Sequence, residues 1–195
     1  MAESIEFQVF SKIKKSKEGT LYFVDNFEAI ANAKSANKAL ERLVLSGELY
    51  RVAMGIYVRP MKDKVVGIVL PDIEDIALAI AKRDKARIVP TGSYALYRLG
   101  LTTQVPLNVV YATDGSPRKI KIGKQTITFK KTSPKNLAAI GDISKLVIQA
   151  LRTIGKDQVT EADIQKIKEL LKNEKTSHLQ NDLKLAPQWI KKLIQ

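Results

Sequence analysis

The fold of this chain is set by residues 35–60, which read SANKALERLVLSGELYRVAMGIYVRP. Apolar residues recur there at the spacing of a helix with one buried face, at Ala36, Ala39, Leu40, Leu43 and Val44. Ser35 suits the N-cap of such a helix, and Gly47 suits the left-handed residue that follows its end. Two runs of β-branched and aromatic residues then flank a short turn at 53–55. The stretch predicts a helix at 35–46 followed by a two-stranded hairpin.

A helix followed directly by a small hairpin is the DNA-reading half of a winged helix-turn-helix. The helix enters the major groove, and the hairpin, or wing, contacts the neighbouring backbone. The candidate DNA contacts are polar side chains that project away from the apolar stripe: Ser35, Asn37, Lys38 and Arg42. Lys38 is expected in the first helical turn, where the helix dipole disfavours a cation, so a bound phosphate would relieve the conflict. For each of these side chains, an ordinary solvated position is the alternative.

The composition is that of an ordinary globular protein, and it limits the kinds of metal site and catalytic site that the chain can form. The 195 residues are 45% hydrophobic and 27% charged, with no cysteine and one histidine, His178. Disulfides and thiolate metal sites are excluded, and imidazole-based metal or triad chemistry nearly so. The first ten residues lack the pattern of a signal peptide, and no stretch approaches the length of about 18 apolar residues that suggests a membrane span. We expect a soluble, cytoplasmic protein without metal or cofactor.

The formal net charge of +13 favours nucleic acid, an anionic surface or an acidic protein as the partner. The charge is unevenly distributed. Residues 1–60 hold nine Lys/Arg against seven Asp/Glu, net +2, and residues 61–133 hold thirteen against six, net +7. Residues 134–195 hold eleven against seven, net +4. The segment predicted to read DNA is therefore not the most basic part of the chain.

Two domains are expected. In the first, residues 1–62, a helix at 5–15, a strand at 20–24 and a second helix ending at Ala33 precede the reading helix. The strand at 20–24 is expected to pair with the wing, completing a winged helix-turn-helix. Residues 61–67 show no strong apolar period and suggest the boundary.

The second domain, residues 66–195, is predicted to be mixed α/β and to end in a helical segment, which makes the whole chain α+β. Its expected elements are a helix from Asp72, a strand at 87–90, a helix at 92–99 capped by Thr91, a strand at 107–113, a hairpin at 118–131 and helices from 143 to the end.

The hairpin at 118–131 is strongly basic. Its candidate anion-binding or partner-binding residues are Arg118, Lys119, Lys121, Lys124 and Lys130, with Lys131 beside them. Such a cluster can bind nucleic acid or an acidic protein. The alternative is a solvated hairpin whose lysines discourage pairing at the sheet edge.

Three features suggest an enzyme, and each is incomplete. Thr91-Gly92-Ser93 resembles the phosphate-facing turn of nucleotidyltransferases, which also need two closely spaced carboxylates on the following strand to hold metal ions. Here that strand ends in a single acid, Asp114. Ser93 lacks the second glycine of a nucleophile elbow, and His178 lies in a polar segment typical of a solvated or capping residue. The sequence predicts a protein that is not an enzyme.

Three stretches resemble the AbiE-type antitoxin family of bacterial type IV toxin–antitoxin systems. LVLSGELYRVAMGIYVRP at 43–60 looks like the helix end and wing of that family, and VPTGSYALYRLGLTTQVP at 89–106 looks like the most characteristic stretch of its second domain. LAPQWIKKLI at 185–194 resembles the close of a related subfamily. The likeness covers most of the chain and is weakest in the first 20 residues.

The resemblance implies a transcriptional autorepressor that binds repeats in its own promoter and neutralises a cognate nucleotidyltransferase-like toxin. It implies that the four polar residues of the reading helix face bases and phosphates, and that Arg51 and Arg59 contact the DNA backbone from the wing. The alternatives are a winged-helix module that binds protein rather than an operator and, less favoured, a degenerate nucleotidyltransferase. The sequence leaves open whether the protein is a monomer in solution or a dimer on DNA.

Overall fold

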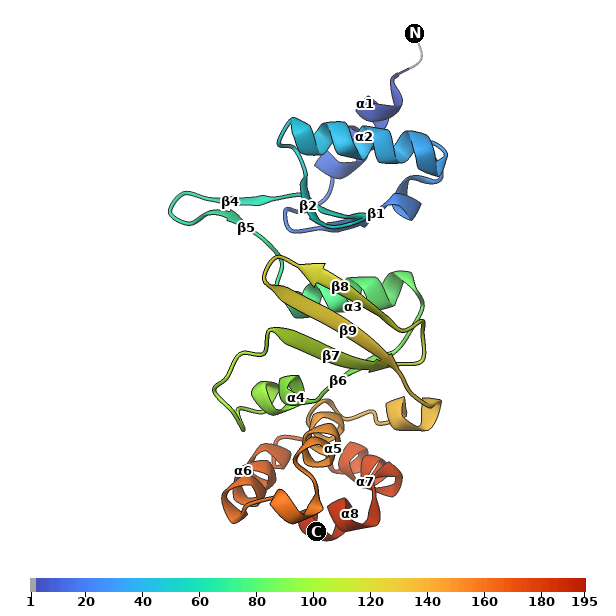
Figure 1. Cartoon of the computed structure of the whole chain (residues 1–195). Helices are drawn as coiled ribbons and strands as arrows, with labels where there is room; N and C mark the ends of the chain where they lie inside the picture. The colour runs from blue at the N-terminus through green and yellow to red at the C-terminus, as the bar shows by residue number, and fades with distance from the viewer. Residues whose placement is uncertain (1–2) are drawn as a thin grey trace. The chain divides into compact units, whose positions relative to one another are not determined.

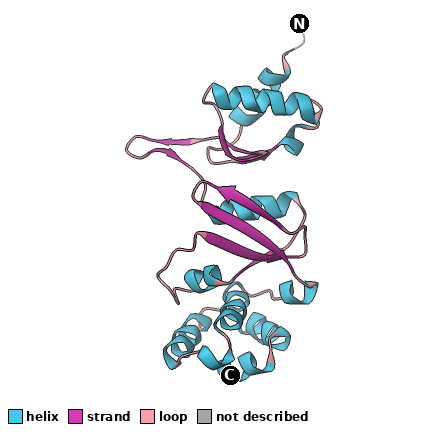
Figure 2. Ribbon diagram, viewed as in Figure 1, coloured by secondary structure: helices cyan, strands magenta, loops and turns pink. Residues whose placement is uncertain are grey.

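The structure, a computed structural model, describes residues 3–195 and has an α+β fold (Figures 1 and 2). Internal contacts divide the chain into two compact units, of which the first ends at Ala79 and the second begins at Ile80. The sequence places the boundary earlier, between residues 62 and 66. Two segments account for the difference: the hairpin at 61–69 and the first part of the helix at 73–83 both belong to the first unit.

The first unit has the order of elements expected of a winged helix. These are α1 (Ile5–Lys14), β1 (Leu21–Phe23), α2 (Ala33–Leu45), β2 (Tyr50–Ala53) and β3 (Ile56–Val58). Strand β3 lies between β1 and β2 and is antiparallel to both. The predicted pairing of the early strand with the hairpin is therefore confirmed.

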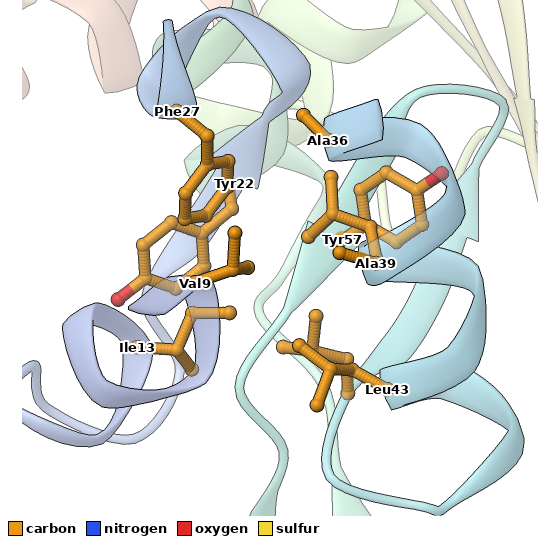
Figure 3. Close-up of a cluster of buried hydrophobic side chains, with 10 residues drawn as sticks. Val9, Ile13, Tyr22, Phe27, Ala36, Ala39, Leu43 and Tyr57 are labelled. Atoms are coloured by element: carbon orange, nitrogen blue, oxygen red, sulfur yellow. The ribbon is translucent and has the colours of Figure 1, made fainter. Parts of the chain in front are cut away.

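The core of the first unit forms between the two helices and the small sheet. Figure 3 shows side chains from these elements pointing toward one another: Val9, Ile13, Tyr22, Phe27, Ala36, Ala39, Leu43 and Tyr57. The apolar stripe predicted for α2 is buried at 36, 39, 40 and 43. Leu40 is fully buried, and burial of such a side chain is worth about 2 kcal/mol. One face of α2 is thus fixed in the core.

The start of α2 differs from the prediction. The helix begins at Ala33, and its N-cap is Asn32, whose side-chain oxygen accepts a hydrogen bond from the Ser35 backbone N–H at 3.0 Å. The predicted cap, Ser35, lies inside the first turn, because Asn32 caps the helix three residues earlier. The predicted helix before it is only a short 3₁₀ segment, Val24–Phe27. The end of α2 follows the prediction, with Gly47 at φ 77°.

A second hairpin follows the wing, where the sequence suggests a boundary at 61–67 and then a short strand or extended linker at 65–70. It consists of β4 (Met61–Asp63) and β5 (Gly67–Val69). The Asp63 carboxylate accepts hydrogen bonds from the backbone N–H groups of Val65, at 2.7 Å, and Val66, at 2.9 Å, which fixes the turn. Both faces of this hairpin are largely exposed, so it lacks the alternation of apolar and polar residues by which strands are recognised.

The second unit contains a four-stranded sheet in the order β6-β7-β9-β8. The strands are β6 (Ile88–Thr91), β7 (Asn108–Thr113), β8 (Arg118–Ile122) and β9 (Gln125–Lys131), and they agree with the predicted strands. Strand β9 inserts between β7 and β8, parallel to β7 and antiparallel to β8. The helix α3 (Ile73–Arg83) precedes the sheet and spans the boundary between the units. The short helix α4 (Ser93–Arg98) starts after Gly92, at φ 64°, whereas the predicted cap Thr91 belongs to β6.

The chain ends in the predicted helical segment. Its helices are α5 (Asp142–Ile154), α6 (Glu161–Leu171), α7 (Thr176–Leu185) and α8 (Gln188–Ile194). They enclose an apolar core in which Val147, Leu151 and Ile190 are almost fully buried. The predicted capping box of Thr160 and Asp163 is present at the start of α6. Within residues 3–195, no helix has the length and apolar character needed to cross a membrane.

Two carboxylates hold the N-terminus of α5. Asp182, fully buried on α7, accepts hydrogen bonds from the backbone N–H groups of Ile140 and Gly141, both at 2.9 Å, and from the Ser144 hydroxyl at 2.5 Å. Glu174 accepts from the backbone N–H groups of Ile143, at 2.8 Å, and Ser144, at 3.1 Å. Side chains from a distant segment therefore satisfy the amide groups that an N-cap residue would otherwise bind.

Candidate nucleic-acid interface

Helix α2 presents a cationic stripe on the face opposite its buried one. Lys34, Lys38 and Arg42 follow one another at intervals of four residues, and all three are exposed. Glu41 is also exposed and lies beside Arg42 in the sequence. The helix thus offers three cations and one carboxylate to a ligand while its other face is fixed in the core.

A hollow of about 410 Å³ lies between the start of α1 and this stripe. Its lining residues are Ser4, Ile5, Glu6, Ser35, Lys38, Ala39 and Arg42. Arg42 Nη1 donates to Glu6 Oε2 at 3.2 Å, and 67% of the Arg42 side chain remains exposed. An ion pair this exposed is worth at most about 1 kcal/mol. A phosphate that approaches the hollow can therefore compete with Glu6 for Arg42.

The predicted contacts on α2 fall into two groups. Lys38 and Arg42 are exposed, whereas Ser35 and Asn37 are half-buried. Because α2 begins at Ala33, Lys38 lies beyond the first turn, and the predicted conflict with the helix dipole does not arise.

Sequence reasoning missed Lys34 and Glu41. Lys34 precedes Lys38 by one helical interval, a signal that becomes visible once Asn32 is recognised as the cap. Glu41 lacks such a signal, because an acid is not an expected contact to DNA phosphates.

The wing supplies one exposed cation. Arg51 on β2 is exposed and lies opposite Tyr57 in the register. Burial raises the pKa of the Tyr57 hydroxyl, and the positive charge of Arg51 partly offsets that shift. Because its side chain is exposed, Arg51 remains a candidate contact to the DNA backbone.

Arg59 has a different position from the one predicted. Its Nη1 donates to the backbone carbonyl of Lys14 at 2.9 Å and to that of Ser16, at the end of α1. The side chain is half-buried and joins the end of β3 to α1. We therefore assign Arg59 to the stability of the first unit and leave it out of the interface.

A second basic surface lies on the hairpin β8–β9. The register places Lys119 opposite Thr128 and Lys121 opposite Thr126, so both lysines share a face of the sheet with Lys130. All three lysines are exposed, and Lys124 is exposed in the turn between the strands. The structure thus brings together three of the five predicted residues, with the fourth at the end of the hairpin.

Arg118, the fifth, lies on the opposite face. Its Nη2 is hydrogen-bonded to the Asp84 carboxylate, and its guanidinium lies 5.5 Å from the centre of the Phe129 ring. Burial alone would raise the pKa of Asp84, but the bonds from Arg83 and Arg118 hold it below its usual value. Arg118 therefore links β8 to the residue after α3 and contributes little to an anion-binding surface.

The residues that suggest an enzyme are used in the structure as follows. The Asp114 carboxylate accepts from the Arg87 backbone N–H at 2.8 Å and pairs with Arg87 Nε at 2.9 Å. These hydrogen bonds hold the pKa of Asp114 below its usual value. Ser93 opens α4 and is exposed, and His178 Nδ1 lies 3.7 Å from Glu174 Oε1. Asp114 thus joins two segments of the second unit.

Comparison with known proteins gives a family and, among solved structures, distant matches. No curated protein matches the chain. A crystal structure of the RV2827C protein from Mycobacterium tuberculosis matches 100% of this chain and 82% of its own, at 12% identity and a TM-score of 0.47. A family model described as "Family of unknown function (DUF6088)" matches residues 8–179. The chain therefore belongs to the DUF6088 family.

Proposed function

We propose that the protein binds double-stranded DNA through α2 and the β2–β3 wing and thereby represses its own promoter. The observation that carries this proposal is the stripe of Lys34, Lys38 and Arg42 on the exposed face of α2. A helix with one face fixed in a core and cations along the other can lie in the major groove, where phosphates flank the bases.

Each group has a distinct role in this proposal. Lys34 and Lys38 bind phosphates, and Arg51 contacts the backbone from the wing. Arg42 leaves Glu6 and donates to a phosphate or, through both guanidinium branches, to a guanine. Asn37, on the same helix, has the amide that can pair with an adenine. The lysines of the β8–β9 hairpin add phosphate contacts from the second unit.

We further infer that the protein is the antitoxin of a type IV toxin–antitoxin system and acts in the bacterial cytoplasm. It neutralises a nucleotidyltransferase-like toxin encoded beside it. Support comes from the resemblance of residues 43–60, 89–106 and 185–194 to AbiE-type antitoxins. No cofactor or metal takes part in this function.

DNA binding is tested with the full chain and a labelled fragment of its own promoter, followed by fluorescence anisotropy. The double variant Lys38→Ala/Arg42→Ala is expected to bind more weakly, because it removes a phosphate contact at Lys38 and, at Arg42, a side chain whose loss costs about 1–3 kcal/mol where it reads a guanine. The matched control is Lys168→Ala/Lys172→Ala, which removes an exposed lysine of α6 and the exposed lysine at its C-cap. Equal affinity of the wild type and the α2 variant would remove this helix from the reading surface.

Toxin neutralisation is tested by co-expressing the chain with the adjacent open reading frame. Growth arrest caused by that reading frame alone should be relieved by the full chain. Persistent arrest, with the chain present at a comparable level, would contradict the antitoxin proposal and leave the DNA-binding proposal standing.

A second candidate is a winged-helix module that binds protein. It is favoured by the net charge of only +2 in residues 1–60 and by the exposed Glu41. The two candidates differ in salt dependence, because counterion release makes DNA binding fall steeply as salt rises. An affinity for promoter DNA that stays constant with salt would favour the protein-binding module.

A further inference from the structure

The last helix, α8, is amphipathic in an unusual way. Ile190 and Ile194 pack into the core of the second unit. Trp189, Lys192 and Leu193 lie three and four residues apart on another side of the helix and line a surface hollow of about 560 Å³. Gln188 and Lys156 complete the lining, and Lys156 comes from the turn that follows α5.

Two of the residues that line this hollow, Trp189 and Leu193, are apolar. Trp189 is half-buried, and it also contacts the apolar core of the helical segment. Leu193 is half-buried as well. A tryptophan fixed on one side by a core and open on the other loses little conformational freedom when a ligand packs on it, which is why such residues are common in binding hot spots.

The hollow also has a positive charge. Both charged residues that line the hollow, within the part of the chain that the structure describes, are lysines: Lys156 and Lys192. Lys192 also lies in the last turn of α8, where the helix dipole favours a cation. Lys156 belongs to a separate segment, just after the end of α5. Two lysines from different elements therefore meet at one hollow, a charge that a negatively charged ligand would complement.

The hollow suits a side chain of a partner protein better than a small molecule or a nucleic acid. All five lining residues are exposed or half-buried, whereas small-molecule sites usually enclose most of the ligand. Single-stranded nucleic acid prefers several aromatic side chains for successive bases, and Trp189 is the one tryptophan of the chain.

We propose that this hollow binds a segment of a partner protein that inserts a bulky apolar side chain flanked by carboxylates. The apolar side chain packs on Trp189 and Leu193, and the carboxylates pair with Lys156 and Lys192. This binding site is separate from α2 and the wing, and it does not depend on DNA binding.

The single tryptophan provides the readout. The full chain is titrated with an acetylated, amidated heptapeptide in which a central leucine–phenylalanine pair is flanked by glutamates, and Trp189 emission is followed. A saturable change is expected. A second peptide with lysines in place of the glutamates should cause none.

Charge reversal sharpens the test. Lys192→Glu should weaken binding of the acidic peptide about tenfold, and Lys156→Glu/Lys192→Glu should bind the basic peptide instead. Lys184→Glu is the matched control, because Lys184 is an exposed lysine on α7 outside the hollow, and it should bind as the wild type does.

Three results would overturn the proposal. One is the absence of a saturable change in Trp189 emission with the acidic peptide. Another is equal binding of the acidic and basic peptides by the wild type. The third is tighter binding of a ten-nucleotide thymidine oligomer than of the acidic peptide, which would indicate a nucleic-acid site.

Discussion

Replacing Asp182 by alanine should destabilise the second unit severely. The carboxylate is fully buried and accepts the backbone N–H groups of Ile140 and Gly141, both at 2.9 Å. Alanine leaves both donors without an acceptor at the start of α5. A buried or half-buried donor that loses its partner costs about 1–3 kcal/mol, so the two together predict a loss of about 4 kcal/mol.

The matched control is Asp142→Ala. Asp142 lies in the first turn of the same helix, but its carboxylate is 93% exposed and pairs with Lys145 at 2.6 Å. An exposed ion pair of this kind contributes at most about 1 kcal/mol. The comparison therefore separates a buried carboxylate from an exposed one at the same helix end.

The assay is urea unfolding followed by Trp189 fluorescence. A chain of two units can unfold in two steps, and Trp189 reports the helical segment that contains α5 and α7. A loss below about 1 kcal/mol for Asp182→Ala, or equal losses for the two variants, would refute the reasoning, because it would mean that the two backbone N–H groups find other partners.

The same site predicts the pH dependence of stability. Burial alone would raise the pKa of Asp182, but the hydrogen bonds from Ser144, Ile140 and Gly141 hold it below its ordinary value of 3.8. The ionised form is thus favoured in the folded state. Its contribution is complete well above pH 3.8 and is lost as the pH falls through the lower, folded-state pKa. The stability difference between the wild type and Asp182→Asn should shrink over that range, and a difference that stays constant would contradict this.

Two further predictions concern the first unit. Arg59→Ala should speed hydrogen exchange of the α1 backbone amides, since it removes two hydrogen bonds to the end of that helix. Its promoter affinity per folded molecule should stay unchanged. A loss of affinity in the folded variant would return Arg59 to the interface. Glu6→Gln should strengthen promoter binding, measured by fluorescence anisotropy, up to about fivefold, because it frees Arg42 from an exposed ion pair. An equal gain in the control Glu3→Gln would show that net charge alone is responsible.

Patterns local in sequence predicted the fold well. The apolar stripe of α2, the turn glycines and the alternation in the β8–β9 hairpin each depend on residues a few positions apart, and the structure agrees with them. A short strand or linker was predicted at 65–70, but β4 and its pairing with β5 were not, because both faces of this hairpin are exposed and its sequence carries no period. The parallel pairing of β9 with β7 was also not predicted, because the alternation within one strand does not encode the order of strands in the sheet.

The candidate site was harder to predict, because a cation's use depends on partners far along the chain. Arg59 bonds to residues 43 and 45 positions away, and Arg118 bonds to Asp84, 34 positions away. Lys119 and Lys121, by contrast, alternate with half-buried residues on an edge strand, and their side chains remain exposed. Charge counts treat all of these side chains alike, whereas burial and hydrogen bonding decide which can meet a ligand.

The number of basic surfaces that bind DNA can be counted from salt dependence. The first unit offers four cations, Lys34, Lys38 and Arg42 on α2 and Arg51 on the wing, and the β8–β9 face offers three lysines. Each phosphate contact changes the slope of log affinity against log salt by about −0.9. The first unit alone therefore predicts a slope of about −3.6, and both surfaces together a slope of about −6.3. If both surfaces bind DNA, Lys119→Ala/Lys121→Ala should make the slope shallower by about 1.8, because it removes two phosphate contacts. If the wild-type slope is already the shallower one and this variant leaves it unchanged, the first unit binds DNA alone, and the lysines of the hairpin serve to keep the edge strand β8 from pairing.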